Sequence, residues 1–151
     1  MMNFEVRKSI EFKKLLYYKV TVEMDLLSQI EINITSFLER KNIPKAKVVI
    51  SSVKNAVDAI RSGVIDYEYI MPVSQKFEEE GDFKYLETFE MRNVLEVSIE
   101  GDFIKNDELS QLIDEYLATN QMIVSGVAYY KMNVDKCAED FISMEIYLPL
   151  K

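Results

Sequence analysis

Two short segments of this 151-residue chain repeat one pattern, and the repeat constrains the fold more than any other feature of the sequence. Residues 66–73 read DYEYIMPV and residues 143–150 read SMEIYLPL. Each segment has a glutamate, three apolar or aromatic residues, a proline and an aliphatic residue. The two glutamates, Glu68 and Glu145, are 77 positions apart, and the two prolines have the same offset. A fixed offset of this length, in a chain of single-domain size, predicts two copies of one structural unit.

The hydrophobic pattern predicts the same order of elements twice. Strands are expected where β-branched and aromatic residues alternate, and helices where apolar residues recur every three or four positions. The expected strands are 15–23, 47–53, 64–73, 88–100, 122–133 and 141–150. Each half then has the order strand, helix, strand, strand, while residues 54–62 fit either a short helix or a loop. The sequence therefore predicts an α+β fold, a tandem duplication of a βαββ unit with two antiparallel sheets and one long helix per half.

Residues near the ends of both helices predict where the helices begin and stop. Asp25 is expected to cap the first helix, and either Asn106 or Asp107 the second, because a side-chain oxygen accepts the unpaired N–H groups there. Pro44 stops the first helix near Asn42, and Asn120 is expected to take the left-handed conformation after the second. The apolar face of the first helix is expected to consist of Leu27, Ile30, Ile34, Phe37 and Leu38.

A polar segment separates the two expected repeats, which cover about residues 1–75 and 85–151 of a single domain. Residues 74–84 include the acidic run Glu78–Glu80 and then Gly81. A charged run with a glycine is typical of a solvated loop. We therefore expect an acidic surface connection between the halves.

Composition excludes several classes of function. The chain has 18 basic and 26 acidic residues and a net charge of -8, which disfavours direct nucleic-acid binding and binding to anionic membranes. It contains no histidine, so imidazole-based catalytic triads and zinc sites are excluded, and we expect no metal and no cofactor. Its single cysteine, Cys137, and the lack of a long apolar run or signal peptide fit a cytoplasmic protein.

Strand alternation places the two repeated glutamates on the strand faces away from the helices. Glu145 and Tyr147 share one face of the last strand, and Glu68 has the corresponding place in its own strand. If the non-helical faces of the two halves meet, both carboxylates approach one cleft. Such a cleft, with aromatic walls, suits a flat organic cation. The alternative is that both glutamates lie on the solvated face of an antiparallel sheet.

Two adjacent tyrosines complete the candidate ligand-binding set. Tyr129 and Tyr130 must face opposite sides of their strand, and either ring could contact a ligand, although core packing is the commoner fate of a strand tyrosine. The candidate set is Glu145, Tyr147, Glu68, Tyr129 and Tyr130. Cys137 has no histidine to activate it and is expected to be a surface thiol rather than a nucleophile.

The repeat, and the second half in particular, resembles the GyrI-like effector-binding domains. These domains occur alone and as C-terminal ligand modules of AraC-type and MerR-type multidrug regulators. The likeness rests on DYEYIMPV, on EGDF at 100–103 and the helix after it, on GVAYYKMN at 126–133 and on SMEIYLPL. The resemblance implies a duplicated βαββ fold with a central cleft for amphipathic, often cationic or aromatic compounds. It also implies that Glu145 is the pocket glutamate and that Tyr129 or Tyr130 is the tyrosine in the preceding strand.

Three functions are compatible with these features. The favoured one is a stand-alone domain that captures or senses amphipathic, aromatic or cationic small molecules. The second is a hydrolase of reactive small molecules, for which the resemblance implies Glu145 as proton shuttle and Tyr129 or Tyr130 as its partner. The third is an acidic protein-interaction module that uses residues 78–82 to contact a basic partner.

Overall fold

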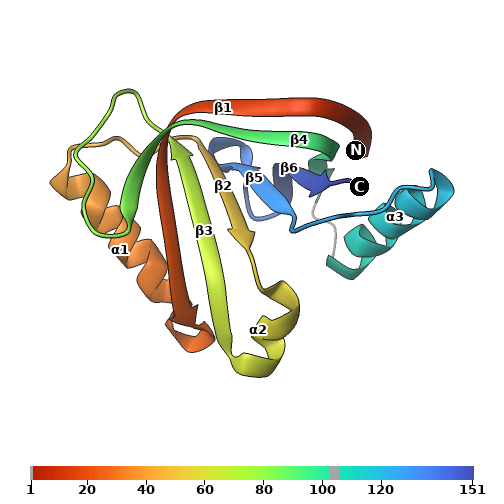
Figure 1. Ribbon diagram of the computed structural model, residues 1–151, viewed down its shortest axis with the longest axis horizontal. Helices are drawn as coiled ribbons and strands as arrows, with labels where there is room; N and C mark the ends of the chain where they lie inside the picture. Colours follow the sequence, from red (N-terminus) through yellow and green to blue (C-terminus); the bar gives the residue numbers. More distant parts are fainter. Residues whose placement is uncertain (1, 103–105) are drawn as a thin grey trace. The chain divides into compact units, whose positions relative to one another are not determined.

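The computed structural model of the chain describes residues 2–102 and 106–151, and it divides into two compact units (Figure 1). We call Glu11–Glu90 the first unit. The second unit consists of Met1–Ile10 together with Met91–Lys151. Two long strands, β1 and β4, each contribute residues to both units.

The first unit contains an antiparallel sheet with a long helix on one face. Its sheet has the order β1-β3-β2, formed by the second part of β1 (Met2–Glu23), β3 (Val64–Pro72) and β2 (Val48–Val53). The turn η1 (Met24–Leu26) leads into α1 (Leu27–Arg40), and α2 (Ala56–Ser62) joins β2 to β3. In Figure 1, α1 lies alongside β1, and α2 lies at the ends of β2 and β3. The ambiguous segment after β2 is thus a short helix.

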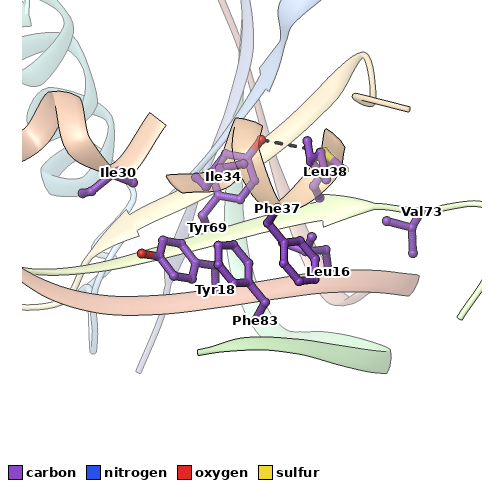
Figure 2. Packing of buried hydrophobic residues seen from close by; sticks show 10 residues of the cluster. Leu16, Tyr18, Ile30, Ile34, Phe37, Leu38, Tyr69, Val73 and Phe83 are labelled. Atoms are coloured by element: carbon purple, nitrogen blue, oxygen red, sulfur yellow. Dashed lines mark hydrogen bonds between the residues drawn. The ribbon is translucent and has the colours of Figure 1, made fainter. Parts of the chain in front are cut away.

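Stacked aromatic rings organise the core between α1 and this sheet (Figure 2). Phe83, the first residue of β4 (Phe83–Asp102), lies between the rings of Tyr18 and Phe37, with centroid distances of 4.2 and 4.1 Å. The Tyr69 hydroxyl donates a hydrogen bond to the sulfur of Met71 in the same cluster, at 3.7 Å. Four of the five predicted core residues of α1 are buried: Ile30, Ile34, Phe37 and Leu38. Because these residues are spaced for one helical face, α1 can bury them all against one side of the sheet.

The second unit has an antiparallel sheet of its own, with the strand order β4-β6-β5. Besides the second part of β4 it contains β5 (Tyr129–Asn133) and β6 (Phe141–Pro149), joined through the turn η2 (Val134–Lys136). Helix α3 (Asn106–Thr119) packs on the aliphatic face of the sheet. The buried core there consists of Leu95, Val97, Ile99, Leu109 and Ile146. Among the described residues, no helix is long and apolar enough to cross a lipid bilayer.

Backbone details recur at matching places in the two units. Lys14 in β1 and Asn93 in β4 both have a positive φ, of 56° and 51°. The Lys14 carbonyl accepts the N–H of Val73, and the Asn93 carbonyl accepts the N–H of Leu150, each at 2.8 Å. In both sheets the last strand of the unit lies between the other two. These features agree with a repeated unit, and the origin of the fold by duplication stays a prediction.

Several element boundaries differ from the predictions. Asp25 does not cap α1: it lies within η1, and the N-cap position is Leu26, which forms no side-chain capping bond. Leu27 is exposed rather than part of the core. After α3 the left-handed residue is Gln121, while the Asn120 side chain donates instead to the Tyr116 carbonyl at 2.8 Å.

Strand lengths differ as well. β1 begins at Met2 rather than near residue 15, and β5 covers only Tyr129–Asn133 of the expected 122–133. Phe103 of the EGDF segment and the capping side chain expected at Asn106 lie outside what the structure describes.

We expect Gly63→Ala to destabilise the chain by about 1–2 kcal/mol, because Gly63 ends α2 with φ of 72°, a conformation that Cβ strains. Gly126→Ala is the matched control. The φ of Gly126 lies outside the positive range, and its new Cβ would meet only the Pro149 side chain, at 3.5 Å. Urea unfolding followed by circular dichroism measures both changes. Equal effects of the two substitutions would contradict the strain at Gly63.

Candidate functional site

One of the repeated glutamates lies on each sheet, on the face opposite the helix of its unit. In the second unit, Glu145 of β6 is directly opposite Ser98 of β4 and Lys131 of β5. In the first unit, Glu68 of β3 is directly opposite Lys19 and Ser52. Directly paired residues share a face, so these sets lie away from the aliphatic and aromatic cores. The predicted orientation of both glutamates is therefore found in the structure.

The Glu145 carboxylate is held by an asparagine from the end of β5. The Asn133 side-chain amide donates to Glu145 Oε2 at 3.3 Å and to the Ser143 hydroxyl at 3.0 Å. Ser143 is 2% exposed, whereas Glu145 is half-buried. Glu145 Oε1 has no hydrogen-bond partner among the described residues. One oxygen of this carboxylate is thus positioned by the protein, and the other can accept a further donor.

A cavity of about 410 Å³ lies at this glutamate, entirely within the second unit. Two cross-strand pairs, Ser98 with Glu145 and Glu100 with Ser143, contribute its polar wall. The other lining residues that the structure describes are Ile99, Met144 and Asn3. Its volume falls within the range of ordinary small-molecule sites.

Glu68 has a different environment, because both of its oxygens are engaged within the first unit. The side chain of Glu68 is buried, at 2% exposure. Lys54 approaches Oε1 at 2.8 Å, and the Tyr17 hydroxyl donates to Oε2. Burial, and secondarily the charge of Lys19, lower the pKa of Lys54. Glu68 is thus an internally paired carboxylate.

The three candidate tyrosines differ in the face of the sheet on which they lie and in how far they are buried. Tyr129 and Tyr147 are directly paired on the face of Glu145, and they are 8% and 2% exposed. Burial raises the pKa of both hydroxyls, and nearby Glu96 and Glu145 add to the effect at Tyr147. Tyr130 pairs with Ile146 on the opposite face and is 42% exposed. The structure therefore brings Tyr129 and Tyr147, but not Tyr130, to the side of Glu145.

Sequence reasoning missed the partners of both glutamates. Tyr17 and Lys54 come from β1 and from the turn after β2, and Asn133 comes from the end of β5. Alternation within β1 puts Tyr17 on the same side of that strand as Lys19. Which residues of β3 lie opposite them depends on the register between the two strands, and one sequence does not give that register. Because Glu68 and Glu145 belong to different units, their meeting in one cleft stays a prediction.

Two further candidates have local roles. The backbone N–H of Ser143 donates to Cys137 Sγ at 3.5 Å, so this thiol is partly buried beside β6. In the acidic connection, Glu80 forms ion pairs with Arg40 and Lys41 at 3.0 and 3.4 Å. Part of the acidic charge is therefore neutralised against α1. In the described part of the chain, no cluster of three or more cysteine or acidic side chains could hold a metal ion.

Solved structures share this fold. The chain matches EcmrR in a cryo-EM structure of an EcmrR-DNA complex with a TM-score of 0.66 and 11% identity. That match covers 99% of this chain and 57% of the EcmrR chain. The crystal structure of the EcmrR C-terminal domain matches with a TM-score of 0.62 and 10% identity over 98% of both chains.

A third similar structure is a hydrolase from Listeria innocua, with a TM-score of 0.59 and 9% identity over 99% of this chain and 91% of that one. No protein-family model and no curated protein sequence matches the chain. At these identities the likeness shows the fold alone. The chain shares the α+β fold of the EcmrR C-terminal domain.

Proposed function

We propose that this chain is a small-molecule-binding domain that takes an organic cation at Glu145. The observation that carries the proposal is the 410 Å³ cavity beside a half-buried carboxylate with one oxygen left to accept a donor. The fold shared with the EcmrR C-terminal domain supports it, since GyrI-like domains, which this sequence resembles, are ligand modules of multidrug regulators.

The charges around the cavity favour a cationic ligand. Glu100 and Glu145 both line it, while Lys131 is the cation directly opposite Glu145. These three groups sum to one negative charge at neutral pH. A cation that enters the half-buried site loses hydration, and charge-assisted hydrogen bonds to the carboxylates offset that cost in part. An anion would be repelled, in keeping with the net charge of -8 of the whole chain.

We expect cationic amphipathic compounds to raise the melting temperature of the wild-type chain but not of Glu145→Gln. A ligand at a hundred times its Kd stabilises the folded state by about 2.7 kcal/mol, which a thermal-shift assay resolves. The panel should pair cationic, neutral and anionic aromatic compounds of similar size. Glu139→Gln is the matched control, because it removes the same charge from an exposed side chain outside the cavity lining. Equal shifts in the wild type and Glu145→Gln would refute a site at Glu145.

A hydrolase on the same scaffold is the second candidate function. One observation favours it: Glu68 and Tyr17 form a hydrogen-bonded carboxylate–phenol pair, the group types needed to move a proton. The fold is also that of a hydrolase from Listeria innocua. In this candidate the catalytic glutamate is either Glu68 with Tyr17 or Glu145 with Tyr129. Turnover of electrophilic test substrates that neither Glu68→Gln nor Glu145→Gln slows would eliminate it.

A further inference from the structure

We infer that the cation recognised at Glu145 is one that donates several hydrogen bonds, such as a guanidinium or a primary ammonium, in preference to a quaternary or aromatic cation. This inference rests on the proposed function and specifies its ligand class. It differs from the expectation of a flat aromatic ligand drawn from the sequence. It follows from the lining of the cavity, the pairing of its residues and the depth of the nearby tyrosines.

The described lining residues offer hydrogen-bond acceptors and no ring faces. Two carboxylates, two hydroxyls and one amide come from Glu100, Glu145, Ser98, Ser143 and Asn3, and the two apolar lining residues are aliphatic or thioether side chains. Carboxylate and hydroxyl oxygens accept N–H donors, whereas quaternary ammonium ions have no N–H and are recognised by aromatic faces. The lining thus matches a donor-rich cation.

The tyrosines on the same face do not supply an aromatic cage. Tyr147 and Tyr129 are 2% and 8% exposed, so their rings are packed inside the protein. Tyr130 is exposed, but it belongs to the opposite face of the sheet. Among the described residues, a ligand at Glu145 therefore finds carboxylate contacts and no accessible tyrosine ring on the same face.

The register of β4 and β6 sets the spacing of the two carboxylates. Ser98 is directly opposite Glu145, and Glu100 is directly opposite Ser143, so Glu100 and Glu145 are diagonal neighbours on one face. Diagonal neighbours of this kind are about 7–8 Å apart at the backbone. One planar guanidinium, with five N–H donors around its edge, can reach acceptors on both sides across such a gap.

Asn133 reinforces this preference by fixing Glu145. Its amide donates to Oε2 of Glu145 and to the hydroxyl of Ser143, which leaves Oε1 as the oxygen of Glu145 that can accept from a ligand. An acceptor oxygen in a fixed position forms a stronger hydrogen bond with a cation that has an N–H to point at it. A quaternary ion has no N–H and is held there only by charge attraction, which has no preferred direction.

Isothermal titration with four small ions tests the inference at one fixed ionic strength. The probes are the chlorides of butylguanidinium, butylammonium, butyltrimethylammonium and benzyltrimethylammonium. We expect the first two to bind the wild-type chain at least roughly tenfold more tightly than the quaternary ions. Glu145→Gln should abolish this preference and Glu100→Gln should reduce it, whereas the Glu139→Gln control should retain it. Glu100 is exposed, so its substitution tests the site even if Glu145→Gln lowers stability.

The titrations distinguish an error in the ligand class from an error in the proposed function on which it rests. Tighter binding of the quaternary ions, lost in Glu145→Gln, would overturn the inference and leave the proposed function standing. If neither these ions nor the larger cationic compounds bind the wild type, the proposed function itself fails. A guanidinium preference that survives both Glu100→Gln and Glu145→Gln would also overturn the inference, because the selectivity would then arise elsewhere.

Discussion

Replacing Phe37 by alanine should lower the free energy of unfolding by about 3–5 kcal/mol. The Phe37 side chain is fully buried, and its ring is stacked on Phe83 and edge-on to Phe77 at 5.5 Å. Its removal leaves a cavity beneath α1 that the neighbouring rings of the stack cannot fill without losing their own contacts. Urea unfolding followed by far-ultraviolet circular dichroism gives the change directly.

The matched control for this substitution lies on the same helix. Ile32 of α1 is 55% exposed, so Ile32→Ala removes an apolar side chain without opening a core cavity. Its effect should stay within about 0.5 kcal/mol. If Phe37→Ala were as mild as Ile32→Ala, the ring stack would not be the principal packing of the first unit.

The faces of the elements could be predicted from the sequence because they depend on local periodicity. The spacing of Ile30, Ile34 and Phe37 fixes one side of α1, whatever the helix packs on. Helix ends depend on competition between neighbouring residues. Asp25 fell within a 3-10 turn, and Gln121 took the left-handed position predicted for Asn120. A single residue type is a weak guide to which of two adjacent positions ends a helix.

The sequence predicted the strand faces on which the two glutamates lie, but not how far each carboxylate is buried. Alternation placed Glu68 and Glu145 on the non-helical faces, yet Glu68 is buried against Lys54 and Tyr17 while Glu145 is only half-buried at a cavity. The same motif thus has two environments, because the partners come from other strands whose register the motif does not encode. The repeat predicts where the carboxylates point, and the neighbouring strands determine their chemistry.

Buried tyrosines predict a steep loss of stability at alkaline pH. Burial raises the pKa of Tyr69 and of Tyr147 well above the usual value of about 10, and nearby glutamates, Glu31 for the first and Glu96 for the second, raise it further. A group whose pKa is raised by folding contributes stability that is complete below its unfolded pKa and is lost as the pH rises above it. For these two hydroxyls together, the expected loss is about 3 kcal/mol between pH 8 and pH 11.

Tyrosine-to-phenylalanine variants isolate this contribution from other groups that titrate in the same range. The double variant Tyr69→Phe/Tyr147→Phe should lose about 3 kcal/mol less than the wild type between pH 8 and pH 11 in urea unfolding. Tyr130→Phe, which removes the same hydroxyl from an exposed ring, is the matched control. If the double variant lost as much stability as the wild type, the two hydroxyls would ionise as readily in the folded chain as in the unfolded one. That result would mean that water reaches both rings in the folded chain. Tyr147 would then be accessible to a ligand at Glu145, against the burial on which the preference for a donor-rich cation depends.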